Sequence, residues 1–287
     1  INEAGAVSSF IAAGMSYSTH GTHMIPFYIF YSMFGFQRVW DFIWAAGDMR
    51  VRGFLLGGTA GRTTLNGEGL QHQDGHSHLA AAATPNIKAY DLAYAYEIAH
   101  IIQKGMREMI EDNVDVIYYL TLENQNYVHP PMKKNTEQGI EKGLYRLFEN
   151  KDSTVELFGS GPLLSETLEA ANLLKNDWGI ESSVWSVTSY SELRKEAEDV
   201  GRWNRNYPDK ETKLSFIQKS LIGIKNPIVA VTDYMKLVSE QIRPFVSNTY
   251  LTLGTDGFGR SETRESLRKF FEVDRFYIVF ASIQSLV

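Results

Sequence analysis

Short apolar runs alternate with helix-length segments along the second half of the chain. This feature constrains the fold most, because strands that alternate with helices of this length form βαβ units and a mostly parallel sheet. The strands expected here cover 154–158, 183–187, 228–232, 250–253 and 277–281. The helices expected between them follow the turn at 159–162 to about 176 and cover 191–200, 235–245 and 261–271. The sequence therefore predicts an α/β protein with helices flanking its sheets.

The first half is rich in glycine and aromatic residues and repeats the alternation less regularly. Strands are expected at 24–29, which reads as buried, and at 53–58, 86–90 and 114–120. Helices are expected at 3–13, at 31–46, and from a cap at Asp91 to about residue 110. The turn-rich segment 124–131 ends in two prolines and indicates an exit from a first domain. We therefore expect two domains, 1–132 and 133–287, with 201–213 as an exposed polar excursion.

Charge and composition exclude several classes of protein. The 287 residues include 28 basic and 34 acidic ones, and a net charge of −6 argues against a sequence-independent nucleic-acid binder. The absence of cysteine excludes disulfides and thiolate ligands and is compatible with a cytosolic protein. The longest uncharged apolar run, 24–37, is too short to span a bilayer, and the first residues, which lack a basic region before an apolar core, are not expected to be a signal peptide. Because the chain lacks a starting Met and begins in a helical pattern, we expect a piece of a longer protein.

Residues 57–78 are the segment most typical of a binding site. They contain six glycines, three histidines, two carboxylates and an arginine. Glycines allow backbone to approach a ligand closely, and loops that follow parallel strands are where ligands bind. A solvated surface loop would not need three histidines beside carboxylates. A metal site is an alternative, with His72, Asp74, His76 and His78 as ligands, but the zinc spacing H-E-x-x-H is absent. One histidine that acts on a substrate is favoured.

The segment 31–46 places Tyr31, Phe34 and Arg38 on one helical face, at i, i+3 and i+7. An aromatic stripe at helical spacing is usually core, but burying Arg38 without a partner is costly, which favours a surface that faces a ligand. Glu3 stands at the start of the first helix, where a carboxylate ordinarily complements the helix dipole. The chain has no G-x-S-x-G elbow, P-loop or dinucleotide fingerprint. The turn 255–261 reads as a strand-to-helix connection.

Several long stretches carry a resemblance to a known family. They are 25–29, 31–38, 44–48, 57–78, 94–97, 232–237 and 254–261. Through them the sequence resembles, over essentially its whole length, the homodimeric bacterial type of pyruvate dehydrogenase. This enzyme is the thiamine-diphosphate-dependent first component of the pyruvate dehydrogenase complex. The string 65–72 is long and specific.

The resemblance implies two transketolase-like domains, each a mostly parallel sheet flanked by helices. They are the pyrimidine-binding domain, with its N-terminal part missing, and the C-terminal domain. The family's Gly-Asp-Gly…Asn motif, which holds magnesium, does not occur here, so magnesium and the diphosphate are expected to bind a domain outside this chain. The resemblance further implies pyruvate as substrate, a lipoyl domain of dihydrolipoyl acetyltransferase as partner, and a cytoplasmic homodimer with its active site at the interface. No nucleic acid, membrane or metal ligand in this chain is expected, and the chain alone is expected to be inactive.

By the same resemblance, Glu3 matches the glutamate that hydrogen-bonds the cofactor's pyrimidine ring, which replaces the helix-dipole interpretation. Burial is expected to raise its pKa and to suit a shared proton. Phe34 matches an aromatic residue that stacks on the pyrimidine. Arg38 and Glu68 are expected to be neighbours of the pyrimidine and the substrate.

Tyr31 and His72 match residues beside the substrate, where they can hydrogen-bond its carboxylate or a developing oxyanion. Two departures from the family pattern are Gln73, where relatives often have Glu, and the bulky Trp40. Another 2-oxo acid dehydrogenase or a transketolase is the alternative enzyme. A truncated assembly paralogue would be expected to lose Glu3 or His72, and both are present.

Overall fold

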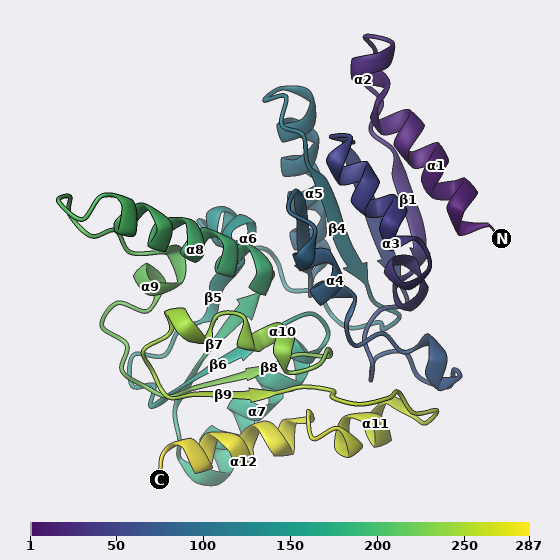
Figure 1. Cartoon of the computed structure of the whole chain (residues 1–287). Helices are drawn as coiled ribbons and strands as arrows, with labels where there is room; N and C mark the ends of the chain where they lie inside the picture. The colour runs from purple at the N-terminus through teal and green to yellow at the C-terminus, as the bar shows by residue number, and fades with distance from the viewer. Residues whose placement is uncertain (1) are drawn as a thin grey trace.

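The computed structural model describes residues 2–287; Ile1, the first residue of the predicted first domain, lies outside the described residues. It contains two sheets, each flanked by helices, in two units that lie side by side (Figure 1). One sheet is fully parallel, and the other is parallel except for one edge strand. This architecture confirms the predicted α/β class. No helix among residues 2–287 is long and apolar enough to cross a membrane.

The first unit has the strand order β1-β2-β4-β3. The strands are β1 (Phe27–Tyr31), β2 (Gly53–Gly58), β3 (Ile87–Asp91) and β4 (Ile117–Leu122). The helices are α1 (Glu3–Gly14), α2 (Ser16–Thr19), α3 (Ser32–Asp48), α4 (Ser77–Ala83) and α5 (Ala95–Ile110), with a 3₁₀ turn η1 (Leu70–His72). Successive side chains of a strand point to opposite faces. Leu55 and Tyr119 therefore pack with the cluster of α1 and α3, whereas Phe54 and Tyr118 pack with the cluster of α5.

The second unit has the strand order β5-β7-β6-β8-β9, with β5 antiparallel to β7. The strands are β5 (Leu144–Phe148), β6 (Val155–Gly159), β7 (Ser182–Val187), β8 (Ile228–Val231) and β9 (Tyr250–Leu253). The helices are α6 (Glu137–Lys142), α7 (Leu163–Trp178), α8 (Tyr190–Asn206), α9 (Phe216–Ser220), α10 (Leu237–Glu240), α11 (Arg264–Phe270) and α12 (Arg275–Ser285), with a 3₁₀ turn η2 (Arg243–Phe245). The predicted division at residues 132 and 133 falls in the irregular segment between β4 and α6.

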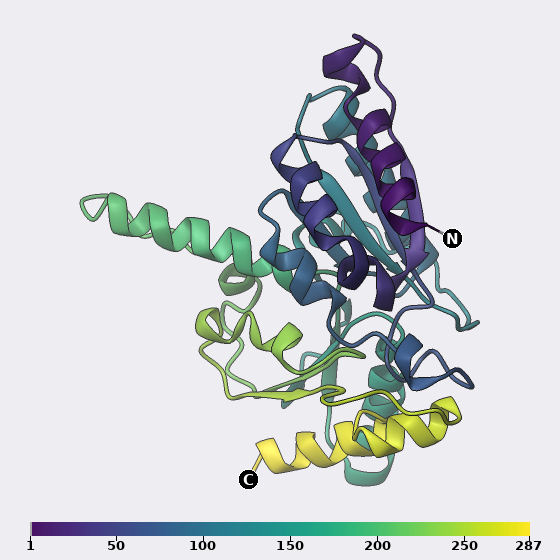
Figure 2. The same ribbon diagram turned by 45° about the vertical axis from the view of Figure 1, so that its right-hand side comes forward.

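The predicted last strand, 277–281, is wrong, because this segment forms part of α12. The run is rich in β-branched and aromatic residues, which favours a strand locally. However, the Asp274 carboxylate accepts hydrogen bonds at 3.0 Å from the backbone N–H groups of Phe276 and Tyr277 and caps a helix. The buried residues then recur at helical spacing, and the helix packs on α7 (Figure 2).

Asp91 does not cap a helix as predicted. It ends β3, where its carboxylate accepts a hydrogen bond from the Thr121 hydroxyl at 2.9 Å. The helix begins at Ala95, because the buried Glu97 carboxylate accepts from the N–H groups of Ala93 (2.6 Å) and Tyr94 (3.0 Å). The signal for this start was Glu97, whose charge complements the first turn.

Three further expectations differ from the structure. The predicted helix 235–245 is broken into α10 and η2, and the turn contains Pro244, which lacks the N–H that a continuing helix needs. Helix α8 runs to Asn206, so residues 201–206 of the expected exposed polar segment 201–213 are helical. Strand β1 is an edge strand rather than a buried one, and it leaves Phe27, Ile29 and Tyr31 exposed.

The segment between β2 and α4 leaves the first unit and lies along the second, beside the start of α11 in both views (Figures 1 and 2). The N–H of Gly67 donates to the carbonyl of Glu262 at 3.2 Å, and the Arg264 guanidinium donates to the carbonyl of Thr64 at 2.9 Å. The glycine-rich segment is therefore fixed between the two units.

Candidate functional site

A cavity of about 580 Å³ opens at the carboxyl ends of β1 and β2. Tyr31 and Gly58, the last residues of these strands, line it together with residues of α1 and α3. The lining is mostly apolar, and Glu3 and Arg38 are its charged side chains. Crevices at the carboxyl ends of parallel strands are the usual ligand sites of α/β folds, and this volume suits a small molecule.

Three aromatic side chains meet beside this cavity. The ring of Phe34 lies 6.2 Å from Tyr31 and 5.1 Å from His72, measured between centroids, and Tyr31 lies 5.8 Å from His72. All three pairs meet edge to face, the favourable geometry for aromatic rings. Tyr31 precedes α3 and Phe34 belongs to its first turn, so their proximity is local. His72 comes from η1, about 40 residues later in the chain.

Glu3 and Arg38 form an ion pair across the cavity, from α1 to α3. The Arg38 guanidinium also lies 4.2 Å from the centre of the Phe34 ring. Phe34 and Arg38 are four residues apart on one helix, which explains this cation–π contact. The ion pair with Glu3 and the contact with Phe34 together explain how the charged Arg38 is accommodated on an aromatic face.

The pKa of Glu3 is lowered, whereas burial was expected to raise it. A hydrogen bond to its own backbone N–H is the largest cause, and the hydrogen bond from Arg38 comes next. Glu3 lies at the rim of the cavity, so that desolvation is too weak to overcome these contacts. In this chain the carboxylate is therefore held in its charged form.

The three histidines of the glycine-rich segment point to different places. His76 shares a hydrogen bond with the Gln37 amide at 2.9 Å, and His78 is buried against the Thr121 hydroxyl at 3.1 Å. Burial lowers the pKa of His78 to about 4. Asp74 accepts from the N–H groups of residues 76 and 77 at the start of α4. Among residues 2–287, no three side chains of the metal-binding types are grouped so as to hold an ion.

Glu68 is exposed on the glycine-rich segment and does not line the cavity. Of the six predicted site residues, the structure brings five together: Glu3, Tyr31, Phe34, Arg38 and His72.

Tyr28 and Ile29 also line the cavity, and the sequence argument missed them. The alternation along β1 could have indicated Ile29, because an edge strand exposes every second apolar side chain. It gives no signal for Tyr28, whose side chain points to the opposite face of the strand.

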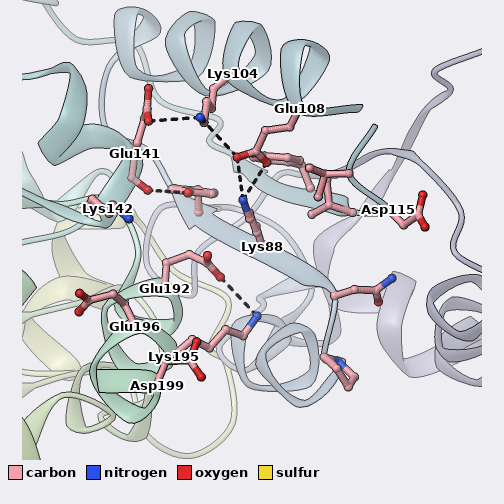
Figure 3. A pocket seen from close by; sticks show the side chains of 16 residues that line it. Lys88, Lys104, Glu108, Asp115, Glu141, Lys142, Glu192, Lys195, Glu196 and Asp199 are labelled. Carbon is pink, nitrogen blue, oxygen red and sulfur yellow. Dashed lines mark hydrogen bonds and ion pairs between the residues drawn. The ribbon is translucent and has the colours of Figure 1, made fainter. Parts of the chain in front are cut away.

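A second cavity, of about 470 Å³, lies at the junction of the two units (Figure 3). Several of its charged side chains pair with one another. Lys88 lies 2.7 Å from Glu108, and Lys104 lies 3.4 Å from Glu108 and 3.7 Å from Glu141. The pair of Lys104 with Glu141 joins α5 to α6 and therefore connects the two units. Because Lys88 and Lys104 already pair with these carboxylates, they are better explained as contacts within and between the two units than as a ligand site.

Family models match both parts of the chain. Residues 1–130 match the pyruvate dehydrogenase E1 component middle domain, and residues 143–274 match the transketolase-like TK C-terminal domain. Among similar proteins are the pyruvate dehydrogenase E1 components of Pseudomonas aeruginosa (59% identical), Escherichia coli K12 (51%) and Mycobacterium tuberculosis (47%). Each match covers the whole chain and 33%, 32% and 31% of the relative, respectively. The chain thus spans about a third of the length of the curated relatives it matches.

Solved structures of transketolases share the fold. A transketolase from Leishmania mexicana superposes with a TM-score of 0.69 at 17% identity, over 91% of this chain and 34% of that one. A split-gene transketolase, described as an inactive beta4 tetramer, gives 0.68 at 16% identity, over 100% of this chain and 82% of that one.

Proposed function

The chain is a relative of the pyruvate dehydrogenase E1 components along its whole length, and we propose that it forms part of a thiamine-diphosphate-dependent pyruvate dehydrogenase. The observation that carries this proposal is the set of side chains around one cavity. Glu3, Tyr31, Phe34 and Arg38 line it, and His72 meets Tyr31 and Phe34 at its side. We assign residues 1–132 to the pyrimidine-binding domain and 133–287 to the C-terminal domain.

The cavity suits the pyrimidine end of thiamine diphosphate. It offers an apolar interior, the ring of Phe34 for stacking, and the Glu3 carboxylate for a hydrogen bond to a ring nitrogen. The bound group supplies the carbon nucleophile that attacks the keto carbon of a 2-oxo acid. Magnesium and the diphosphate need hard oxygen ligands, which we expect from residues outside this chain.

The chain's own residues have three tasks in this proposal. Phe34 orients the pyrimidine by stacking, and Glu3 exchanges a proton with the ring nitrogen. Because Arg38 already holds Glu3, Arg38 must release it or share it when the ring enters. Tyr31 and His72 lie on the same side of Phe34, where they orient the substrate carboxylate and donate a hydrogen bond to the oxygen that becomes negative.

Pyruvate is the proposed substrate, and the acetyl group passes to the lipoyl domain of a dihydrolipoyl acetyltransferase. We also propose a cytoplasmic homodimer in which a second copy covers the cavity. Exposed apolar side chains lie on β1, at Phe27 and Ile29, and on α3, at Trp40 and Trp44, and Ile29 lines the cavity. Apolar surface of this extent is typical of an interface.

The proposal is tested by His72→Ala in the full-length enzyme. Turnover with pyruvate should fall by roughly 10²-fold or more, the range of a positioned acid–base or oxyanion group. Thiamine diphosphate affinity, measured by calorimetry, should be unchanged. His76→Ala is the matched control, because His76 bonds Gln37 outside the cavity. A collapse of cofactor affinity would instead make His72 a cofactor ligand or a structural residue.

A further inference from the structure

We propose that the second unit positions His72, and that Gln73 and the backbone at Gly259 and Arg260 transmit this positioning. The proposal rests on the proposed function, because it takes His72 to act on the substrate. His72 projects from η1, a single 3₁₀ turn whose preceding residues 66–68 are exposed. What holds this turn therefore decides where the imidazole lies relative to Tyr31 and Phe34.

Gln73 ties the turn to two distant pieces of backbone. Its side chain is fully buried. Its amide nitrogen donates to the carbonyl of Leu65 at 2.8 Å, and its amide oxygen accepts from the N–H of Arg260 at 2.6 Å. The first bond closes the glycine-rich segment on itself. The second bond crosses to the second unit, 187 residues along the chain.

Gly259 packs directly against the same turn. A Cβ atom at this position would lie 2.6 Å from the Gln73 amide oxygen and 2.7 Å from the carbonyl oxygen of Leu70. Real Cβ atoms do not approach this closely, so a side chain at 259 must displace the turn. One of the two contacts is backbone, which cannot move aside by changing rotamer. The absence of a side chain at Gly259 therefore allows the backbone of the second unit to pack against the η1 turn that carries His72.

The rest of the contact makes the second unit the rigid support of this segment. The Asp233 carboxylate accepts four hydrogen bonds from Thr63 and Thr64, and the Arg62 guanidinium donates to the carbonyl of Thr255 at 2.6 Å. The cavity itself belongs to the first unit. The angle between the units thus sets the distance between His72 and the rest of the site. A displacement near 1 Å is enough to cost about 10²-fold in rate.

Gly259→Ala in the full-length enzyme tests the proposal. We expect kcat with pyruvate to fall by roughly 10-fold or more, with thiamine diphosphate affinity unchanged. Gly201→Ala is the matched control, because Gly201 lies in helix α8 and a Cβ there meets nothing within 4 Å. Gln73→Ala is the second variant, should Gly259→Ala fail to fold. Gln73→Glu keeps an oxygen that can accept from Arg260 and should retain more activity than Gln73→Ala.

The decisive measurement repeats these changes in the His72→Ala background. If they act through His72, Gly259→Ala and Gln73→Ala should lower kcat no further there. A loss by the same factor in both backgrounds would overturn the positioning role and leave the proposed function standing. If His72→Ala alone leaves turnover unchanged, the proposed role of His72 fails, and the positioning role fails with it.

Discussion

Replacing Asp233 by alanine is expected to loosen the segment that carries His72. Asp233 follows β8 and is completely buried. Its two oxygens accept from the N–H groups of Thr63 at 2.9 Å and Thr64 at 3.0 Å, and from the hydroxyls of both residues at 2.6 Å. The carboxylate thus satisfies two buried backbone donors that lie some 170 residues away in sequence.

The cost follows from the donors left without an acceptor. The hydroxyls can rotate to other partners, but the two N–H groups cannot. Each buried, unsatisfied group costs about 1–3 kcal/mol, so Asp233→Ala should lower the free energy of local opening by about 2–6 kcal/mol. Asp233→Asn keeps one acceptor oxygen and turns an NH₂ group toward Thr64, so about half of that loss is expected.

Hydrogen–deuterium exchange of residues 59–75 measures this opening. Because every 1.4 kcal/mol is a factor of ten, the Thr63 and Thr64 amides should exchange at least about 30-fold faster in Asp233→Ala. Asp256→Ala is the control, since Asp256 is a half-exposed carboxylate nearby that accepts from the N–H of Lys236. Equal protection in the wild type and Asp233→Ala would refute the reasoning that this carboxylate holds the segment.

Three further outcomes are expected. Glu3→Gln in the full-length enzyme should slow hydrogen–deuterium exchange at the thiazolium carbon by ~10²-fold or more, and an unchanged exchange rate would remove its assigned role. Burial raises the pKa of Asp91 to about 7, so the stability this group contributes is complete below about pH 4 and is lost as the pH rises through 7. Asp91→Asn should therefore raise the Tm at pH 8 more than at pH 5, and an equal shift at both would contradict this. Asp274→Ala should destabilise α12 by about 0.5–2 kcal/mol, seen as faster amide exchange in the first turn of the helix.

Local pattern was sufficient for most of the fold. The strands 53–58 and 250–253 match β2 and β9 residue for residue, because each is a short apolar run bounded by turn residues. The segment 277–281 shows where this reasoning fails. Its composition favours a strand, but the capping Asp274 and the packing surface of α7 favour a helix. The cap is a local signal in the sequence, whereas the contact with α7 is a tertiary contact.

The same distinction between local and tertiary contacts applies to the residues of the site. Phe34 and Arg38 could be placed together from helical spacing, since their contact lies within one helix. The pair of Arg38 with Glu3 joins two helices, and no periodicity encodes it. Asp233 gave no signal from the residues around it, because its four donors belong to the other unit.

The pKa of Glu3 should depend on whether a second copy of the chain covers the cavity. Its lowered pKa depends on hydrogen bonds at an open rim, where water still reaches the carboxylate. A surface that covered the cavity would remove that water, and desolvation favours the neutral form of a carboxyl group. Entry of a pyrimidine ring would also compete for Arg38. Both changes raise the pKa of Glu3, as proton exchange with a ring nitrogen requires. The ionisation of Glu3 should therefore depend on closure of the cavity more than on the contacts within α1 and α3.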